Sequence, residues 1–599
     1  MNQARQVPSP GGWQENIRAL PWLVRGAPRW ALLLLGLVLV AAGLFLFVRP
    51  LTALQFLGVY VAISALVAGI AELLTPPEDG PRPLLLATGI LWILVGLSGL
   101  VWWSRDVALF GPVVAIALLV SGGLRMLRFA QNRSWESFAG ALVGAAEVLF
   151  GVLAFAWPDA TLIVTGVLFG GRTVVFGLVL LVRAVAPTTG QPSGASRTRR
   201  IGYLAFAVML LAGAVGTTWL GQGLRQGPPV PDAFYETPAT LPGTPGTLIR
   251  TGPYQGNLPT GMKGFRIYYT TTNATGEIVA SSGILAVSEH ATGPSPLITW
   301  AHGTVGITRA CAPSNGLSAF ALDQEPAADQ FAALGWAFVA TDYPGMGAEG
   351  AFPYLIGQGE GRAVLDAARA ARQVPGVTLD DRTVIWGHSQ GGHSALWAGQ
   401  LARTYAPDLK VMGTAALSPA SSPRALADSV LSHPGAAGAS LGIAYVVKAY
   451  TDYYPDLSFD QVTVPAGRTL IREAAARCTG QGGTLVTILA GLSIGRDTPL
   501  ITAGALSGPF GQRLDENLPS GTWDAPLFIG QGESDEVINF SINQKYVATL
   551  CAEGTDVEFH GYPGGTHMSV IATGSTLSRD LVKWTQDRLA GRPSTPNCP

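Results

Sequence analysis

The sequence predicts two architectures in one chain, an α-helical polytopic membrane domain of about seven spans followed by an α/β domain. Residues 1–222 consist of long uncharged apolar runs, whereas the polar content from about residue 250 onward is that of a water-exposed protein. The second half contains short β-branched or aromatic runs that are fit for parallel strands. One of these runs leads into a Gly-x-Ser-x-Gly pentapeptide and then into a helical pattern, which is the order of a parallel α/β sheet.

The membrane domain is predicted from stretches that are long enough to cross a bilayer, for which about 20 apolar residues are needed. A signal peptide could resemble the first stretch, but its apolar core is too long and further spans follow, so we expect an anchor. The stretches are approximately 31–48, 51–74, 84–103, 107–127, 137–157, 161–183 and 201–220.

Arginines predict the orientation, because short cytoplasmic loops carry the positive excess in membrane proteins. Every second loop is basic, while the intervening loops, such as Trp157-Pro158-Asp159, are nearly uncharged. We therefore expect a cytoplasmic N-terminus, and seven spans then bring the C-terminal half to the outside. The arginines are Arg5, Arg18, Arg25, Arg29, Arg125, Arg128, Arg133, Arg183, Arg197, Arg199 and Arg200.

The first six spans look like one helical hairpin used three times. Similar stretches begin at Gly43, Gly96 and Gly151, about 54 residues apart, and each is followed by a second apolar helix. A fixed period of this kind indicates an internal repeat. Residues 30–185 resemble the HdeD-like family of bacterial membrane proteins, which are built from tandem two-helix units.

Two ionisable residues, Glu147 and Arg172, are expected at similar membrane depth on either side of the third hairpin turn. Charges at that depth are costly unless they are paired. We therefore expect a mutual ion pair, and the functional alternative is a path for protons or ions.

Charge and composition give no reason to expect nucleic acid as a partner. The net charge is -1, and no basic stripe is present that could hold phosphates, so nucleic acid is not an expected partner. We expect no cofactor, and the sequence does not specify an oligomeric state.

Four cysteines, all in the second half, predict disulfides in an oxidising compartment. No two of them are spaced as metal ligands usually are, so we expect no metal site. Four cysteines allow three pairings, and their spacing does not choose among them. They are Cys311, Cys478, Cys551 and Cys598.

The domain boundaries follow from composition. Residues 223–250 are rich in Pro, Gly and Thr without periodicity, which is typical of a linker. We therefore expect a membrane domain over 1–222 and an α/β domain over 251–599.

Ser389 is the expected nucleophile, on the strength of its surroundings rather than its pentapeptide. Two other Gly-x-Ser-x-Gly matches occur, around Ser440 and Ser493. A nucleophile elbow must join a buried strand to a helix, because the strained turn raises the hydroxyl into the site. Only Ser389 lies between such elements, the strand 382–386 and the helix 393–403.

The acid and the base are expected downstream, because the order in α/β hydrolases is serine, acid, histidine. Asp535 follows the predicted strand 525–530, with Glu533 and Glu536 as alternatives. His567 lies on a Gly-rich loop after the last predicted strand, 557–562. Imidazole takes the proton of the serine hydroxyl, and a carboxylate orients the imidazolium. His560 lies within that strand and is expected to pack or to face solvent.

The oxyanion hole should combine the N–H after the nucleophile with one from an earlier loop. These requirements select Gln390 and, in the loop after the predicted strand 297–301, Thr304. Gly303 is the alternative to Thr304.

The motifs of the second half resemble the secretory lipase family, including the fungal lipase A type, over about residues 240–590. The resemblance implies an α/β-hydrolase domain, a helical cap over about 421–522, and hydrolysis of lipid esters. It further implies the disulfides Cys311–Cys478 and Cys551–Cys598. The motifs are His302-Gly303-Thr304, Cys311-Ala312-Pro313-Ser314, Thr341-Asp342-Tyr343-Pro344-Gly345 and Gly387-His388-Ser389-Gln390-Gly391-Gly392.

We therefore expect a membrane-tethered, extracytoplasmic lipase or esterase whose partners are an ester substrate and the bilayer. An acyltransferase or a peptidase is an alternative, because one triad serves many acyl acceptors. The alternative from another class is a membrane stress protein whose hydrolase fold binds lipid without catalysis.

Overall fold

The chain divides into two compact units, of which the larger contains all of Gly213–Pro599 and the smaller contains most of the N-terminal helices. The structure is a computed structural model. It describes residues 28–74, 110–131, 133–185, 196–224, 230–316, 325–432, 437–479 and 500–598, and a few positions within 90–100 and 483–488.

The N-terminal helices agree with most of the predicted spans. In the described part, five helices are long and apolar enough to cross a membrane. A further apolar helix, α4 (Pro50–Leu74), coincides with the second expected span. The span expected at 84–103 lies largely outside the described residues, so the count of seven stays a prediction. The five helices are α3 (Arg29–Phe47), α6 (Phe110–Gln131), α7 (Trp135–Ala156), α8 (Pro158–Val185) and α9 (Ser196–Leu224).

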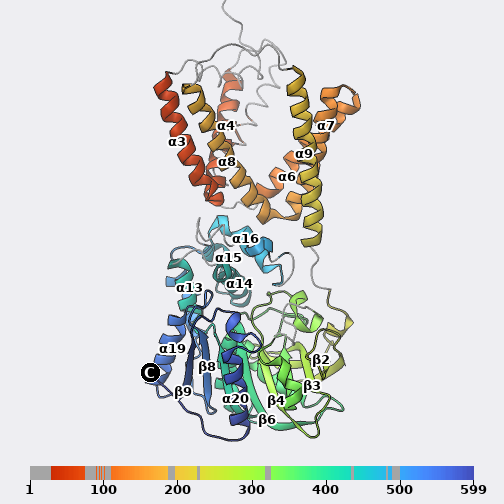
Figure 1. Cartoon of the computed structure of the whole chain (residues 1–599), viewed down its shortest axis with the longest axis vertical. Helices are drawn as coiled ribbons and strands as arrows, with labels where there is room; N and C mark the ends of the chain where they lie inside the picture. Colours follow the sequence, from red (N-terminus) through yellow and green to blue (C-terminus); the bar gives the residue numbers. More distant parts are fainter. Residues whose placement is uncertain are drawn as a thin grey trace, which may run out of the picture. The chain divides into compact units, whose positions relative to one another are not determined.

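Glycines allow α3 and α8 to approach each other closely (Figure 1). A Cβ atom at Gly177 would lie 2.8 Å from the carbonyl oxygen of Gly36, and one at Gly170 would lie 2.5 Å from the backbone nitrogen of Phe47. Small residues are the usual contacts between membrane helices, where association depends on close packing rather than on the hydrophobic effect.

The ion pair expected between Glu147 and Arg172 is wrong. Glu147 instead faces Arg125 on α6, with 3.2 Å between its Oε2 and the arginine Nε. The reason is the packing of α6 against α7, where a Cβ at Gly122 would lie 2.4 Å from the carbonyl oxygen of Gly144. This contact brings Arg125 beside the carboxylate, whereas Arg172 is exposed.

The larger unit is built on a nine-stranded sheet in the order β1-β2-β3-β5-β4-β6-β7-β8-β9. The strands from β5 to β9 are parallel, and β1, β2 and β3 extend the sheet in antiparallel fashion. The strands are β1 (Leu248–Pro253), β2 (Met262–Thr272), β3 (Ile278–Ser288), β4 (Ser295–Ala301), β5 (Ala337–Thr341), β6 (Leu379–His388), β7 (Lys410–Leu417), β8 (Leu527–Gly532) and β9 (Val557–Tyr562).

Helices cover both faces of the sheet, because alternate residues of its strands are buried in two separate cores. On one face Trp386 of β6 packs in the same core as Trp584 of α20 (Thr576–Leu589), which lies along the strands in Figure 1. On the other face Ile529 of β8 packs with Leu396 of α12 (Gln390–Tyr405) and Val547 of α19 (Phe540–Ala552). The helix α11 (Gly357–Ala371) packs beside α12.

The insertion between β7 and β8 contains helices and, in its described residues, a single isolated β-bridge, Thr463–Ile501. These helices lie in the segment for which the family resemblance implies a helical cap. Its principal helices are α13 (Pro423–Ser432), α14 (Ala437–Tyr453), α15 (Phe459–Val462), α16 (Arg468–Ala475) and α18 (Pro509–Glu516).

The segment expected as a linker is partly docked on the larger unit. The side chain of Tyr235 is fully buried, and its hydroxyl lies 2.8 Å from Ser314 Oγ. The N–H of Gly246 donates to the carbonyl oxygen of Thr270 on β2. The α/β unit therefore begins before the expected residue 251, because an aperiodic Pro- and Gly-rich segment can still hydrogen-bond to a strand.

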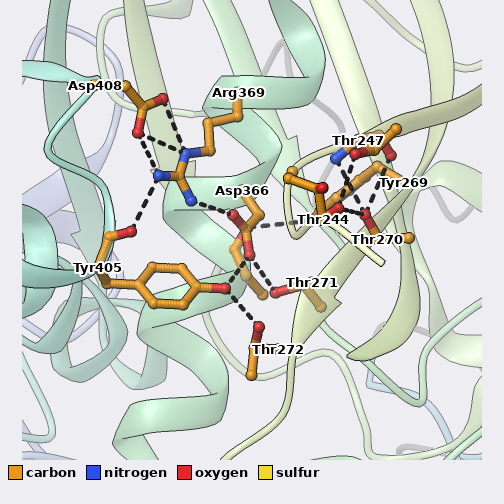
Figure 2. A network of polar contacts seen from close by, with 12 residues as sticks. Thr244, Thr247, Tyr269, Thr270, Thr271, Thr272, Asp366, Arg369, Tyr405 and Asp408 are labelled. Atoms are coloured by element: carbon orange, nitrogen blue, oxygen red, sulfur yellow. Dashed lines mark hydrogen bonds and ion pairs between the residues drawn. The ribbon is translucent and has the colours of Figure 1, made fainter. Parts of the chain in front are cut away.

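A polar network fastens β2 to the helices α11 and α12 (Figure 2). Its centre is Asp366 of α11, whose fully buried Oδ2 accepts from Thr271 Oγ1 at 2.8 Å and from the hydroxyl of Tyr405 at 2.6 Å. Arg369 bridges the same carboxylate to Asp408. The two helices that flank the candidate site are thus held firmly against the sheet.

The Arg125–Glu147 pair yields a test in the membrane helices. We expect Arg125→Gln to destabilise the chain by about 1–2 kcal/mol, because it leaves a carboxylate between helices without its partner. The measurement is the fraction of monodisperse protein left after heating in detergent. Arg172→Gln is the matched control, and an equal or larger loss in that variant would contradict the pairing.

Candidate active site

Ser389 lies in a sharp turn between β6 and α12, with φ 58° and ψ -120°. A side-chain-bearing residue in this left-handed region is strained, and such strain is typical of a nucleophile elbow. The turn is possible because glycines surround it. A Cβ at Gly391 would lie 1.8 Å from the carbonyl oxygen of Ala301, and one at Gly387 would lie 2.0 Å from that of Gly391.

Of the two competing serines, Ser440 does not share this environment. Ser440 lies within helix α14 and does not follow a strand. Ser493 lies outside the described residues.

Three predicted side chains meet in one hydrogen-bonded line. Ser389 Oγ lies 2.9 Å from His567 Nε2, and His567 Nδ1 lies 2.8 Å from Asp535 Oδ2. A carboxylate only accepts hydrogen bonds, so Nδ1 carries the proton and Nε2 is free to accept from the serine hydroxyl. Such a line can activate a hydroxyl for attack on an acyl carbon.

Asp535 is stabilised as a carboxylate by its surroundings. Its Oδ1 accepts the N–H groups of Val537 and Ile538, at 2.9 and 2.8 Å. Burial alone would raise the pKa of Asp535, but the hydrogen bond and charge of His567 and the two backbone donors hold it below its ordinary value.

The alternative acids have other positions. Glu536 Oε2 accepts the backbone N–H of His567 at 3.1 Å, so it orients the loop rather than the ring. The Glu533 carboxylate lies beside Gly561. His560 is stacked on Phe528 and lies 3.4 Å from Glu558, which agrees with the packing role expected for it.

Two backbone N–H groups are available beside the serine. Those of Gln390 and Thr304 have no protein acceptor among the described residues. Thr304 belongs to the loop after β4, and the neighbouring Gly303 lies so close that a Cβ there would be 3.6 Å from Ser389 Cβ. Both groups can therefore donate to a negatively charged oxygen next to Ser389.

A disulfide and two hydrogen bonds fix the loop after β4 to the helical insertion. Cys311 is bonded to Cys478, and the adjacent Thr479 donates its N–H to Val305 and its hydroxyl to Thr304 O, each at 2.9 Å. The second disulfide, Cys551–Cys598, joins α19 to the C-terminal segment. Both pairs are those that the family resemblance implied.

Several residues that support the triad were not predicted from the sequence. Burial and the charge of His567 lower the pKa of His388 to about 3, and its ring lies 4.6 Å from that of His567. Gln531 donates to Asp535 Oδ2 at 3.0 Å and accepts from Asn543 at 2.6 Å. The positions of His388 in the pentapeptide and of Gln531 at a strand end were the available signals, whereas Asn543 carried none.

A cavity of about 200 Å³ opens beside Ser389 and is lined mainly by aliphatic side chains. In the described part of the chain, no group of three or more His, Cys, Asp or Glu residues could hold a metal ion. The aliphatic residues of the lining are Leu355, Leu426, Val430, Leu441, Ile443, Val446, Val537 and Ile538.

The two halves of the chain are similar to different families of known proteins. Residues 330–597 match the model of the secretory lipase family, and residues 34–101 and 142–215 match a short repeat of unknown function, DUF308. Lipase A of Moesziomyces aphidis is 25% identical over 405 residues, which cover 63% of this chain and 85% of the relative. A protein of Mycobacterium tuberculosis named probable inactive lipase is 29% identical over 416 residues, or 64% of this chain and 90% of the relative.

The crystal structure of Candida antarctica lipase A is similar in fold, with a TM-score of 0.50, 21% identity, and coverage of 62% of this chain and 88% of that one. The C-terminal half of this chain is therefore similar to the secretory lipases, a family of carboxylic ester hydrolases, and its N-terminal half carries DUF308 repeats.

Proposed function

We propose that this chain is a membrane-tethered serine hydrolase that cleaves the carboxylic esters of lipids. The observation that carries the proposal is the line from Ser389 Oγ through His567 to Asp535, which ends in an aliphatic cavity. Fatty acyl chains are apolar, and an aliphatic wall suits them better than it suits a peptide or a sugar.

The proposed reaction has two half-reactions. In acylation, His567 Nε2 takes the hydroxyl proton as Ser389 Oγ attacks the ester carbonyl carbon, and the same proton then leaves with the alcohol. In deacylation, His567 takes a proton from water, whose oxygen attacks the acyl carbon. The bond from that carbon to Ser389 Oγ then breaks, the acid leaves, and His567 returns the proton to Oγ. The N–H groups of Gln390 and Thr304 would stabilise the oxyanion in both steps, and Asp535 would stabilise the imidazolium.

The proposed location is the outer side of the membrane, with a cytoplasmic N-terminus. Two observations support it. The arginine-rich loops alternate with uncharged ones, and both pairs of cysteines form disulfides, which persist in oxidising compartments. The membrane domain over 1–222 would then hold the hydrolase close to lipid.

Replacement of the nucleophile is the first test. We expect Ser389→Ala in the full chain to lower kcat/KM for p-nitrophenyl octanoate by about 10³-fold or more, since no other group can form the acyl-enzyme. The release of p-nitrophenol measures the activity. Ser440→Ala and Ser493→Ala are the matched controls, and the assignment fails if Ser389→Ala retains activity.

The choice of acid can be tested separately. We expect Asp535→Asn to lower kcat by about 10⁴-fold, because an amide in place of the carboxylate favours the wrong imidazole tautomer. Glu536→Gln keeps an acceptor for the backbone N–H of His567 and should lower kcat by less than about tenfold. The reverse order of the two losses would assign the acid to Glu536.

The cavity predicts a dependence on acyl-chain length. Val446→Trp fills space next to the aliphatic wall, so activity toward p-nitrophenyl decanoate should fall by about tenfold or more while activity toward the acetate is kept. Lys448→Trp, on the same helix but outside the lining, is the control. Equal losses on both esters would place the acyl chain elsewhere.

A further inference from the structure

A buried carboxylate that the proposed reaction does not use lies behind the nucleophile. Glu360 is in the first turn of α11, and its side chain is fully buried. In the described part of the chain, no lysine or arginine lies within 4.0 Å of it, so hydrogen bonds must stabilise its oxygens. It does not line the cavity and therefore does not touch a substrate.

The candidate oxyanion hole has two sides, one formed by Gln390 and the other by Thr304. The hydrogen-bond donors to Glu360 come from Gln390 itself, its helix α12, and the loop that contacts Thr304. Its Oε1 accepts from Gln390 Nε2 at 2.6 Å and from the backbone N–H of Leu355 at 3.1 Å. Its Oε2 accepts from Ser394 Oγ at 2.8 Å, one turn into α12. One carboxylate thus joins the start of α12 to the loop before α11.

On the Gln390 side of the candidate oxyanion hole, Glu360 contacts the residue that supplies the N–H directly. Gln390 supplies the N–H that follows Ser389, and its own amide side chain is held by Glu360. Gln390 is 1% exposed, so this side chain cannot turn to water for a substitute partner. The orientation of the first peptide of α12 is therefore coupled to the carboxylate.

On the Thr304 side, the connection from Glu360 passes through Leu355 and Tyr354. Leu355 is held in a left-handed conformation, φ 54°, where a residue other than glycine needs tertiary support. Its neighbour Tyr354 has its hydroxyl 2.8 Å from Thr304 Oγ1, beside the other candidate N–H donor. Glu360 is therefore connected to Thr304 as well as to Gln390.

The helix that carries Glu360 is itself anchored. The N–H of Gly357, the first residue of α11, donates to Asn517 Oδ1 at 2.9 Å. The carbonyl oxygen of Asn517 lies 2.7 Å from His393 Nε2, and His393 Nδ1 is 3.5 Å from Glu360 Oε2. These contacts link Glu360 back to the first residue of its own helix through His393 and Asn517, so the carboxylate is held in place by its surroundings.

We propose that Glu360 is a positioning residue that holds the Gln390 and Thr304 N–H groups in register for the developing oxyanion. This inference rests on the proposed ester hydrolysis. Preorganised donors lower the barrier only when they are aimed at the oxyanion, so a loosened pair should reduce transition-state binding more than substrate binding.

The test uses the full chain in detergent micelles. We expect Glu360→Ala to lower kcat for p-nitrophenyl octanoate by about 10- to 100-fold, with KM changed by less than about threefold. The affinity for an alkyl trifluoromethyl ketone, whose serine adduct carries an oxyanion, should fall by a similar factor. Glu360→Gln keeps an acceptor for Gln390 and Leu355, so it should recover most of both losses.

Asp366→Asn is the matched control for general damage. Asp366 is a second fully buried carboxylate on α11, but its partners are Thr271, Tyr405 and Arg369 (Figure 2). This variant should lower the thermal midpoint and leave kcat and ketone affinity within about twofold of the original chain.

Two outcomes overturn the inference. One is a folded Glu360→Ala chain with unchanged kcat and ketone affinity, and the other is an Asp366→Asn chain with the same kinetic losses. If Glu360→Ala does not fold, Gln390→Met removes the same hydrogen bond while keeping the backbone N–H, and unchanged kinetics there overturn it equally. Ser389→Ala in the same assay distinguishes failure of the Glu360 inference from failure of the proposed function. Activity in that variant would refute the hydrolase proposal itself.

Discussion

The site depends on one strained turn, in which Ser389 adopts a left-handed conformation between a buried strand and a helix. The turn raises the hydroxyl above the sheet and leaves the first N–H groups of the helix without intrahelical acceptors. Glycines at 387 and 391 make the turn possible, because carbonyl oxygens occupy the space where a Cβ would lie. His567 and Asp535 can serve this hydroxyl only because the parallel strands end at the same edge.

The fold was predictable where the signal was local. Apolar length predicted most of the long N-terminal helices, and β-branched runs predicted β4, β6, β8 and β9. Helix rotation was not predictable, because hydropathy does not say which glycines touch. The contact of Gly122 with Gly144 therefore gave Glu147 a different partner, Arg125. The aperiodic segment before β1 was misread as a free linker, since its hydrogen bonds to β2 leave no periodic pattern.

The site was predictable for residues that follow strand ends in a fixed order. Ser389, Asp535 and His567 belong to that group, and the structure brings them within hydrogen-bond distance. Glu360 had no such signal, because it precedes its partner Gln390 by 30 residues and lies within a helix of small residues. Buried polar groups of this kind become visible only when the chain has brought their partners together, and each must then be satisfied.

The central claim is that Ser389 is the nucleophile of an ester hydrolase. Its most direct test is to react the full chain with an alkyl fluorophosphonate and to map the adduct by peptide mass spectrometry. We predict a single adduct, on the peptide that contains Ser389, and its loss when the trifluoromethyl ketone is present. An unmodified Ser389, or an adduct on another serine, would contradict it.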